Sequence, residues 1–559
     1  MTQDISSTIK HVGVLPLIKH YCKSLELYNI FDKHIPKYHN ATIAPAEILC
    51  MMIANIISSP SPLYQVHEWV ASRSDGLTEK GVNAAQYNDD QLGRCLDKLF
   101  IADRGTMLTE LSVNAIKTHH LETNTLQNDS TSITLSGQYN GHEPASVSLL
   151  RGYNKDGHPE CKQIVFGLNI TADGNIPISY QLFDGNQPDD TTHIPNWEAL
   201  RQLIDRDDFI YIADSKLCNI DNLGYIDQHG GIFITLMPKN WLPVKNFNKF
   251  IQEHDVLWED AMVKEDTRKK GNFVTYTTHE QEKTKQGYRL IWVKSSAKKI
   301  QDHNRREKAI TKTLTELESI SKRLNKYKLK TEDQIHAAIK KACKGKGHLF
   351  NIDLNSETIV KKIQTTKGRP SSKTSYRNNE ETQYKLEFSL NEEAVTKERR
   401  TDGIFPLVTN SSLSAAEVLK KYKNQPYLEK RMYTTKSILK VAPVFLEKPT
   451  RIEAMLFLYF IALMIVGLIE RTIRKNMAEE KIEAIPIRPG GNKCQKPTWN
   501  NIDYFFREVH QVVISKNGNV IATQTKGITK VHSLVLKLLG VPPITYRNIK
   551  DQWWLFETT

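Results

Sequence analysis

The sequence predicts an α/β protein in which a mixed sheet is covered by helices. Three observations predict this class. Short β-prone runs replace helical periodicity from about residue 121 onward. These runs then alternate with segments of helical length, which is typical of a mixed sheet with helical cover. The same pattern resumes at Gly403, after a basic segment with the character of an insertion. A chain of 559 residues is long enough for three or four such domains.

The first 120 residues are predicted to form an all-α domain. The segment 43–58 is apolar on all sides, and the Ser-Pro pairs that follow it end the helix. Asn88 is a suitable N-cap for a helix over 91–100. The region shows no helix-turn-helix pattern. Its residues alone do not predict DNA binding, which we expect of this domain only from the family resemblance given below.

The segments 121–240 and 401–480 are predicted to form the α/β domain together. The turn 172–175 has the sequence Ala-Asp-Gly-Asn, which is typical of a hairpin between two strands. Ser414 and Glu417 have the spacing of a capping box and predict the start of a helix. The predicted strands are 130–135, 163–171, 176–183, 209–213, 231–236 and 404–409, and the predicted helices include 193–204 and 219–227.

Residues 241–400 are predicted to be a basic insertion domain that contains both strands and helices. They include 35 Lys and Arg against 22 Asp and Glu, an excess that equals the +13 net charge of the whole chain. Each cluster of cations alone could be a solvated helical face. Their concentration in one segment favours a surface that tracks phosphates. The expected elements are strands 273–278, 288–293 and 383–390 and a helix over 310–327, and residues 481–559 form a C-terminal α/β tail.

Composition also limits the cellular setting. The seven cysteines contain no C-x-x-C pair, so neither a disulfide framework nor a cysteine zinc site is predicted. The longest apolar run, 454–469, is shorter than the ~20 residues that a membrane span needs. We therefore expect a buried core helix there, no membrane partner and a cytoplasmic protein.

Three carboxylates have positions suited to chemistry. Asp129 precedes the first strongly β-prone run, Asp214 follows a short apolar strand, and Glu429 lies in the helical stretch after the insertion. Substrates of open α/β sheets collect beyond such strand ends. Three carboxylates brought together suit Mg²⁺, which prefers oxygen ligands. Taken singly, Asp129 could be a turn residue, Asp214 a helix cap and Glu429 a surface acid.

The surroundings of Glu429 strengthen the pattern. Tyr422, Gln425, Glu429 and Lys436 fall within roughly 60° of one another at 100° per residue. One helix face is therefore expected to present an aromatic ring, an amide, a carboxylate and an ammonium group. Pro426 is expected to kink this helix.

In these motifs the sequence resembles a large group of bacterial insertion-sequence DDE transposases. Tyr422, Gln425, Glu429 and Lys436 resemble the group's Y-x2-R-x3-E-x6-K signature, with Gln425 in place of the arginine. The resemblance extends in order over nearly the whole chain. It includes the segments 128–132, 151–156, 212–216, 402–410, 443–446 and 451–454.

The resemblance implies a ribonuclease-H-like catalytic domain interrupted by an insertion between the second and third acids. It implies that Asp129 and Asp214 share one Mg²⁺ and that Asp129 and Glu429 hold a second, with Mn²⁺ as a substitute. Tyr422 is then expected to pack on the DNA end, and Lys436 to hold a terminal phosphate. Gln425 lacks the charge that contacts DNA phosphate in the family.

The function implied is transposition. The enzyme is expected to bind the terminal inverted repeats of an insertion sequence, cleave at the element ends, and join the freed 3′-OH to target DNA. Double-stranded DNA is the expected partner, and a homodimer is expected because two ends are held together. The alternative is a DNA-binding protein of transposase ancestry that no longer cuts. The presence of all three acids and of Lys436 favours the enzyme.

Overall fold

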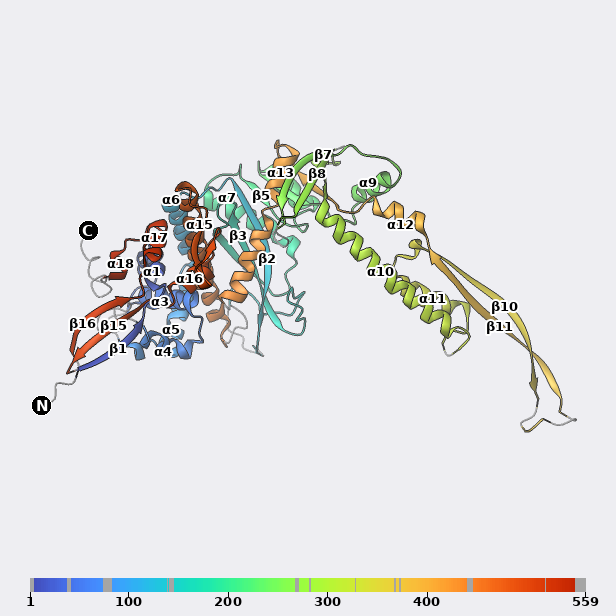
Figure 1. Ribbon diagram of the computed structural model, residues 1–559, viewed down its shortest axis with the longest axis horizontal. Helices are drawn as coiled ribbons and strands as arrows, with labels where there is room; N and C mark the ends of the chain where they lie inside the picture. The colour runs from blue at the N-terminus through green and yellow to red at the C-terminus, as the bar shows by residue number, and fades with distance from the viewer. Residues whose placement is uncertain are drawn as a thin grey trace. The chain divides into compact units, whose positions relative to one another are not determined.

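The structure, a computed structural model, divides into two compact units, Met1–Thr235 with Lys420–Thr559, and Leu236–Leu419 (Figure 1). Each is described by itself. The residues described are 5–37, 42–73, 83–137, 139, 145–266, 271–280, 283–326, 328–365, 368–370, 374–439, 446–517 and 519–547. The insertion predicted over 241–400 lies within the second unit.

The N-terminal part of the first unit is mainly helical, as the sequence predicts. The apolar segment after residue 43 forms a helix of which nearly every residue is buried. The side chain of Asn88 accepts a hydrogen bond of 2.9 Å from the backbone N–H of Gln91, so it caps the next long helix as expected. The helices are α1 (Leu15–Ser24), α2 (Leu27–His34), α3 (Pro45–Ser58), α4 (Val66–Ala71), α5 (Asp89–Ile101) and α6 (Arg104–His119).

This region is not all-α, and that part of the prediction is wrong. It begins with a strand, β1 (Ile5–His11), which pairs antiparallel with β15 (His510–Lys516) from the far end of the chain. β15 in turn pairs with β16 (Asn519–Lys526). The isoleucines and threonine of β1 favour a strand, but only the distant partner makes one stable.

The centre of the first unit is a mixed sheet, which confirms the α/β class. Its strands pair in the order β4-β3-β2-β5-β6. The pairs β4–β3 and β3–β2 are antiparallel, whereas β2–β5 and β5–β6 are parallel. The strands are β2 (Thr125–Leu135), β3 (Lys162–Thr171), β4 (Pro177–Phe183), β5 (Ile210–Ile212) and β6 (Ile232–Leu236), with helices α7 (His193–Ile204) and α8 (Ile220–Gln228) between them in sequence.

The hairpin predicted at 172–175 joins β3 to β4. Gly174 and Asn175 both have positive φ values, 74° and 58°. The backbone N–H of Thr171 donates to the carbonyl of Ile176 at 2.9 Å and closes a four-residue loop, whose last two positions are a glycine and an asparagine because these residues tolerate positive φ best.

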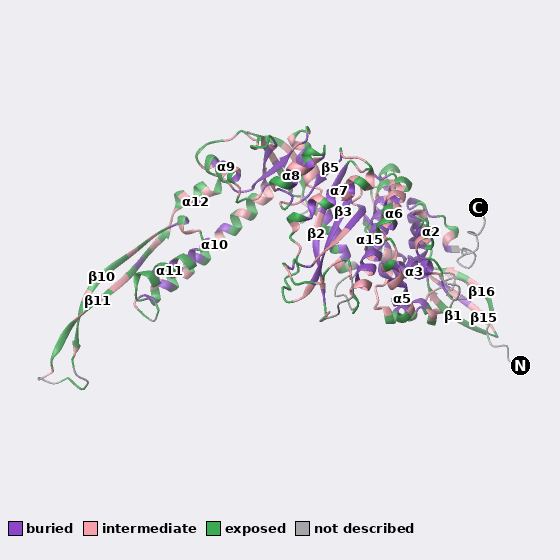
Figure 2. Ribbon diagram, turned by 180° about the vertical axis from the view of Figure 1, so that it is seen from behind, coloured by how far each residue is buried: buried purple, intermediate pink, exposed green. Residues whose placement is uncertain are grey.

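The predicted core helix is α15 (Pro449–Glu479). It is long and apolar enough to cross a membrane, but 89% of its most apolar stretch is buried inside the protein. It packs against α3, α5 and β4, and the burial view shows it as one of the most enclosed elements of this unit (Figure 2). The elements after it are β13 (Ile485–Arg488), β14 (Asn492–Cys494), α16 (Trp499–Phe506), α17 (Lys530–Leu538) and α18 (Ile544–Arg547).

The second unit combines an antiparallel sheet with a helical part that has a core of its own. Strands pair in the order β7-β8-β9-β12, and a separate ribbon is formed by β10 and β11. The strands are β7 (Glu259–Glu265), β8 (Phe273–Glu280), β9 (Arg289–Ser295), β10 (Phe350–Gln364), β11 (Tyr376–Leu390) and β12 (Ile404–Thr409), and the helices are α9 (Leu242–Glu253), α10 (Ser296–Arg323), α11 (Glu332–Cys343) and α12 (Glu392–Arg399).

Candidate active site

Strand register places Asp129 and Asp214 side by side. The last residues paired between the parallel strands β2 and β5 are Gln127 and Ile212. Asp129 and Asp214 each lie two residues beyond this pair. Asp129 lies within β2 and Asp214 just past the end of β5, where ligands collect in open sheets, and the charge of Asp214 acts on the carboxyl of Asp129.

The charges of these two acids influence each other. Burial raises the pKa of Asp129 to about 6; the Lys155 ammonium opposes this rise and the Asp214 charge adds to it. Burial also raises the pKa of Asp214, whose carboxylate accepts a hydrogen bond of 2.9 Å from the N–H of Lys216. Two half-buried carboxylates with raised pKa values form a site that a cation would stabilise.

A lysine and a third aspartate complete this cluster. Lys155 Nζ lies 2.8 Å from both the carbonyl and the hydroxyl oxygen of Ser130, and 3.1 Å from Asp189 Oδ2. The Ser130 hydroxyl donates to Asp189 Oδ1 at 2.7 Å. We did not assign a role to either Lys155 or Asp189 from the sequence. Lys155 lies in the segment 151–156 that resembles the transposase group, which was the one available signal.

A buried polar network lies beside Asp129. The amide of Asn128 donates to Asn169, which donates to Asn196 at 2.7 Å, and Asn196 donates to the Tyr211 hydroxyl at 2.9 Å. The same hydroxyl lies 3.1 Å from Nδ1 of His193. Such a network links β2, β3, α7 and β5, so it holds the two strands that carry Asp129 and Asp214 in one arrangement.

Glu429 is not on the same helix as Tyr422, and that expectation is wrong. Helix α13 (Ala415–Tyr422) ends at Tyr422, and a new helix, α14 (Gln425–Tyr433), carries Glu429. Pro426 explains the break, because proline has no N–H to donate to the carbonyl of Tyr422 four residues earlier. Lys436 lies in a π-helical turn, Thr434–Ile438, that follows α14.

The Tyr422 hydroxyl connects Glu429 with the two aspartates. Burial raises its pKa first, and the charges of Asp214, Glu429 and Asp129 raise it further, in that order. All three predicted acids therefore act electrostatically on one phenol. The hydroxyl stays protonated and remains a hydrogen-bond donor near the three carboxylates.

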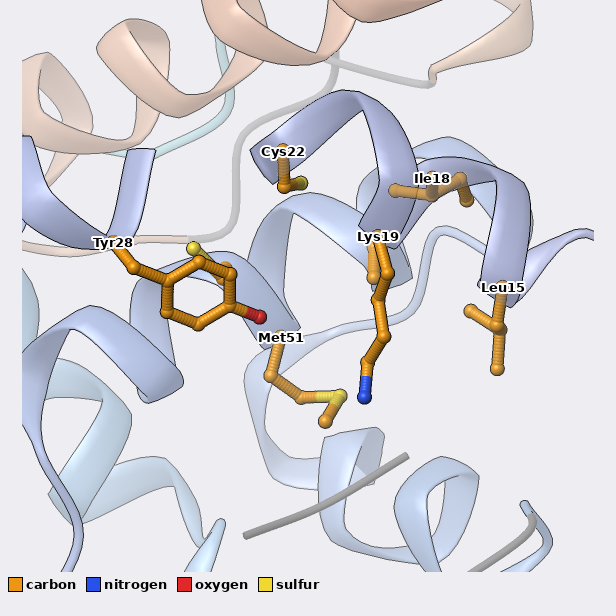
Figure 3. Close-up of a pocket in the computed structure, with 8 residues that line it drawn as sticks. Leu15, Ile18, Lys19, Cys22, Tyr28 and Met51 are labelled. Carbon is orange, nitrogen blue, oxygen red and sulfur yellow. The ribbon is translucent and has the colours of Figure 1, made fainter. Parts of the chain in front are cut away.

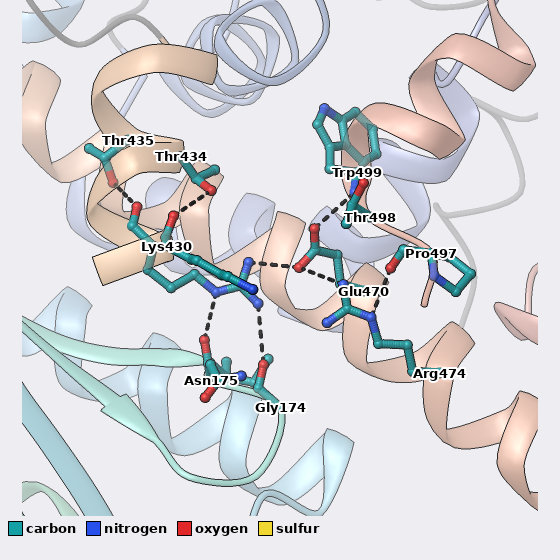
Figure 4. Close-up of polar contacts among 12 residues, drawn as sticks. Gly174, Asn175, Lys430, Thr434, Thr435, Glu470, Arg474, Pro497, Thr498 and Trp499 are labelled. Carbon is teal, nitrogen blue, oxygen red and sulfur yellow. Dashed lines mark hydrogen bonds and ion pairs between the residues drawn. The ribbon is translucent and has the colours of Figure 1, made fainter. Parts of the chain in front are cut away.

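A buried arginine fixes α14 in place. Arg431 donates to the carbonyls of Gly174 and Asn175 at 3.2 and 2.8 Å, and to the Glu470 carboxylate of α15 at 2.9 Å. The other oxygen of Glu470 accepts a 2.9 Å bond from the backbone N–H of Trp499 (Figure 4). The helix of Glu429 also packs against β2, the strand of Asp129. Arg431 is therefore a positioning residue for Glu429.

The structure places the other predicted DNA contacts as follows. Lys436 Nζ is paired with Asp156, at 2.6 Å from Oδ1 and 2.7 Å from Oδ2. Gln425 is the first residue of α14, and its side chain lies outside the described part of the structure. The motif residues 443–445 also lie outside it.

The fit of this site to a metal is partial. Among the described residues, no group of three or more His, Cys, Asp or Glu side chains is arranged to hold a metal ion. Asp129 and Asp214 have the oxygen ligands and the mutual repulsion that suit a shared Mg²⁺. The charge of Glu429 acts on Tyr422, as the charges of the two aspartates do. Glu429 and the two aspartates, all of which the structure describes, do not form one group of metal ligands.

Comparisons with known proteins give two matches. Residues 7–113 match the family model DUF4277, described as a domain of unknown function. Among solved structures, the cryo-EM structure of a piggyBac transposase synaptic complex with hairpin DNA is similar at 12% identity, with a TM-score of 0.29. That match covers 49% of this chain and 61% of the other, and it is too slight to carry an argument. No curated protein matches the chain.

Proposed function

We propose that the protein is a DDE transposase of a bacterial insertion sequence, with a ribonuclease-H-like catalytic domain. It binds the terminal inverted repeats of its element, cuts the DNA at the element ends and transfers the 3′ ends to target DNA. The observation that carries the proposal is the position of Asp129 and Asp214, two residues beyond the last pair of adjacent parallel strands, with Glu429 acting on the same Tyr422 hydroxyl.

The order and direction of the central strands support this catalytic domain. Three antiparallel strands are followed by two that run parallel to the first of them, and the acids lie on the first and fourth strands in chain order. Asp129 and Asp214 would hold one Mg²⁺, and Asp129 with Glu429 a second. When bound, the ions would lower the pKa of the attacking water and offset charge on the leaving oxygen.

The reaction proposed is an in-line displacement at phosphorus. In the first step a water oxygen bonds to phosphorus at the element end and the P–O3′ bond breaks, so that the departing 3′-oxygen takes up a proton. In the second step this 3′-hydroxyl loses its proton and bonds to a target phosphorus, and the target's own 3′-oxygen leaves. Neither step needs an oxidant or reductant. Asp129, Asp214 and Glu429 serve as carboxylate ligands throughout.

The partner proposed is double-stranded DNA, held by a homodimer. Neutralising phosphates with lysine and arginine releases condensed counterions and supplies affinity without sequence preference. The excess of 13 cations in residues 241–400 suits this role. Two element ends are joined in one reaction, so two copies of the chain on DNA are expected. The helical N-terminal part is the proposed reader of the repeats.

A non-cutting DNA-binding protein is the second candidate, and one observation favours it. The described acids form no three-ligand group, and the Lys155 ammonium already neutralises part of the cluster. A protein that had lost metal binding would keep its DNA affinity and its fold. The two candidates therefore differ in cleavage and agree in binding.

Cleavage of inverted-repeat DNA is the experiment that separates them. The substrate is a duplex with the terminal repeat found beside the coding sequence, incubated with Mg²⁺ and resolved on a denaturing gel. The wild-type chain should release a strand ending in a 3′-hydroxyl, whereas Asp129→Asn, Asp214→Asn and Glu429→Gln should each cut at least roughly a thousandfold more slowly, equivalent to ~4 kcal/mol.

Binding of the same duplex is the control for those variants. Each substitution removes one negative charge without removing a cation, so affinity should stay unchanged or rise slightly. Asp190→Asn, beside the cluster in sequence, is a matched variant that should cut normally. A wild-type chain that binds the repeat but never cuts it would support the second candidate.

A further inference from the structure

The second unit carries a long two-stranded ribbon whose outer half has no supporting layer. Strands β10 and β11 pair antiparallel over their whole length, from Phe350 opposite Leu390 to Gln364 opposite Tyr376. The inner half packs on α10 and α11 through a core cluster that includes Leu349, Phe350 and Leu386. The outer half is exposed on both faces, as the burial view shows (Figure 2).

The charged residues are also distributed unequally between the inner and the outer half of the ribbon. The inner half ends at the opposed pair Val360 and Glu380, and its residues 350–360 and 380–390 contain five acids and one lysine. The outer half, residues 361–379, contains six lysines and arginines and no acid. A ribbon exposed on both faces needs polar side chains for solubility, but solubility does not require that all of the charges have one sign. The segregation indicates a polyanionic partner for the outer half.

The register shows which side chains the outer half presents. Opposed residues share a face, so Lys362 lies with Asn378, and Gln364 with Tyr376. The opposite face has Lys361 with Asn379, and Ile363 with Arg377. Lysine, arginine, asparagine and glutamine are the side chains that read base edges in the major groove, and a two-stranded ribbon fits that groove of about 12 Å. The outer half has the composition of a base-reading element as well as the charge of a phosphate-binding one.

We propose that the outer half of β10–β11 is an arm that enters a groove of duplex DNA. This rests on the proposed function only in its choice of DNA as the polyanion. The four strand residues beyond Val360, 361–364, extend about 13 Å, enough to span a groove of about 12 Å and reach the phosphates on both sides. A second copy of the chain is the competing occupant, but two outer halves of like charge repel each other.

Shortening the ribbon is the direct test. Val360 and Glu380 are directly opposed, so replacing residues 361–379 by Asn-Gly joins them through a two-residue hairpin turn. The core cluster at the base involves no residue of the deleted part. The shortened chain should keep its thermal unfolding midpoint. Its affinity for a mixed-sequence duplex of three turns, roughly 30 bp, should fall by at least about tenfold in fluorescence anisotropy.

A charge variant with a matched control tests the role of individual cations. Lys361 is already paired with Glu381, so the variant is Lys362→Gln with Arg369→Gln and Arg377→Gln. The control neutralises three exposed lysines on the helices of the same unit, Lys308, Lys312 and Lys340. The arm variant should make the negative slope of log affinity against log salt shallower by about 2 to 3, because each lost phosphate contact reduces its magnitude by about 0.9. The control should lower it by less than 1.

The outcomes separate the arm from the proposed function. The arm proposal would be overturned if both triple variants changed the salt slope equally, or if the shortened chain kept its DNA affinity. Neither outcome bears on cleavage, which the variants of the three acids test. A shortened chain that loses self-association in analytical ultracentrifugation but keeps DNA affinity would also overturn the arm proposal, in favour of contact between copies. A wild-type chain with no affinity for duplex DNA would overturn both proposals.

Discussion

Lys436 and Asp156 form an ion pair in which the ammonium nitrogen lies within 2.7 Å of both carboxylate oxygens. Asp156 belongs to the loop after β2, and Lys436 to the π-helical turn after α14. The lysine proposed to hold a terminal DNA phosphate is thus already held by an acid when no DNA is present. In the proposed function, a DNA phosphate would have to compete with Asp156 for this side chain.

Removing the acid of this pair should improve the binding of DNA ends. Asp156→Asn frees the ammonium and removes a nearby negative charge, so affinity for a duplex with a 5′-phosphate at the repeat end should rise about two- to fivefold, corresponding to less than ~1 kcal/mol for a part-exposed pair. Lys436→Met should lower the same affinity. The double variant should resemble Lys436→Met alone. Competition binding by anisotropy measures all three, and an affinity that falls with Asp156→Asn would contradict the role of Lys436.

Arg431 should be more important for stability than its neighbours on α14. Arg431→Met leaves the buried Glu470 carboxylate with only Arg474, at 3.5 Å, as a cationic partner and should lower the free energy of unfolding by about 2–3 kcal/mol. The exposed Lys430→Met on the same helix is the control and should change it by less than ~0.5 kcal/mol. Adding Glu470→Met to Arg431→Met should recover part of the loss. Urea denaturation gives these values; a stability loss no larger than that of the control would show that the pair does not hold the helix.

Stability should depend on pH through Lys19. This lysine lines a small pocket with Leu15, Ile18 and Tyr28 (Figure 3), and burial lowers its pKa to about 7. The unfolded chain keeps the usual value near 10.5, so between pH 7 and 10.5 it binds more protons than the folded chain. Below pH 7 the lysine is charged in the folded chain as well, so the cost of burying the charge lowers the free energy of unfolding by its full amount. Between pH 7 and 10.5 this cost diminishes, and the free energy of unfolding therefore rises with pH.

Lys19→Met should therefore stabilise the protein most at low pH. At pH 6.5 the gain should be about 2 kcal/mol, well under the full value of the pKa shift because the buried Glu47 carboxylate, whose charge opposes the shift, loses its cation, and the gain should approach zero near pH 10. Lys117→Met, an exposed lysine on α6, is the control for lost charge. Thermal melts at several pH values measure the difference. A gain that is constant with pH would contradict the lowered pKa.

DNA affinity should fall steeply with salt. If the basic segment 241–400 neutralises five or more phosphates, raising salt from about 50 to 200 mM should weaken binding at least roughly a hundredfold. Nitrocellulose filter binding or anisotropy at several salt concentrations gives the slope directly. An affinity that does not change with salt would remove the DNA-binding role from this segment.

The sequence predicts the central sheet well because its strands are locally encoded. The β-prone runs beginning near Ser130, Gln163 and Phe209 all became strands, and the Gly174–Asn175 turn joined two of them as expected. Asp214 follows the end of β5 as the pattern indicates, whereas Asp129 lies within β2 and not before it, because the strand begins at Thr125. A strand that is buried on one face or on both shows a recognisable pattern of apolar residues in the sequence, and this pattern can be identified without knowledge of the fold.

Elements stabilised by distant partners were harder to predict. β1 depends on β15, about 500 residues away, and no local signal gives that pairing. β10 was missed because a ribbon exposed on both faces has no apolar alternation over most of its length. The break between Tyr422 and Glu429 was underestimated as a kink, although Pro426 was its sequence signal.

The three acids and Lys436 remain predictions from the sequence, whereas the side chains that contact them were not predicted. Position relative to the strands indicated Asp129 and Asp214, and the resemblance indicated Glu429. The partners of these residues depend on how loops fold back. Lys155 contacts Ser130 across 25 residues of sequence, and Arg431 reaches Glu470 across 39. Such contacts have no spacing rule that a sequence can display.

Metal binding by the three acids is the central claim, and Mn²⁺ titration followed by electron paramagnetic resonance measures it most directly. The wild-type chain bound to its repeat DNA should take up two Mn²⁺ ions that Mg²⁺ displaces. Asp129→Asn should lose both ions, whereas Asp214→Asn and Glu429→Gln should each lose one or weaken it at least about tenfold. Two ions bound with unchanged affinity in Glu429→Gln would contradict the claim.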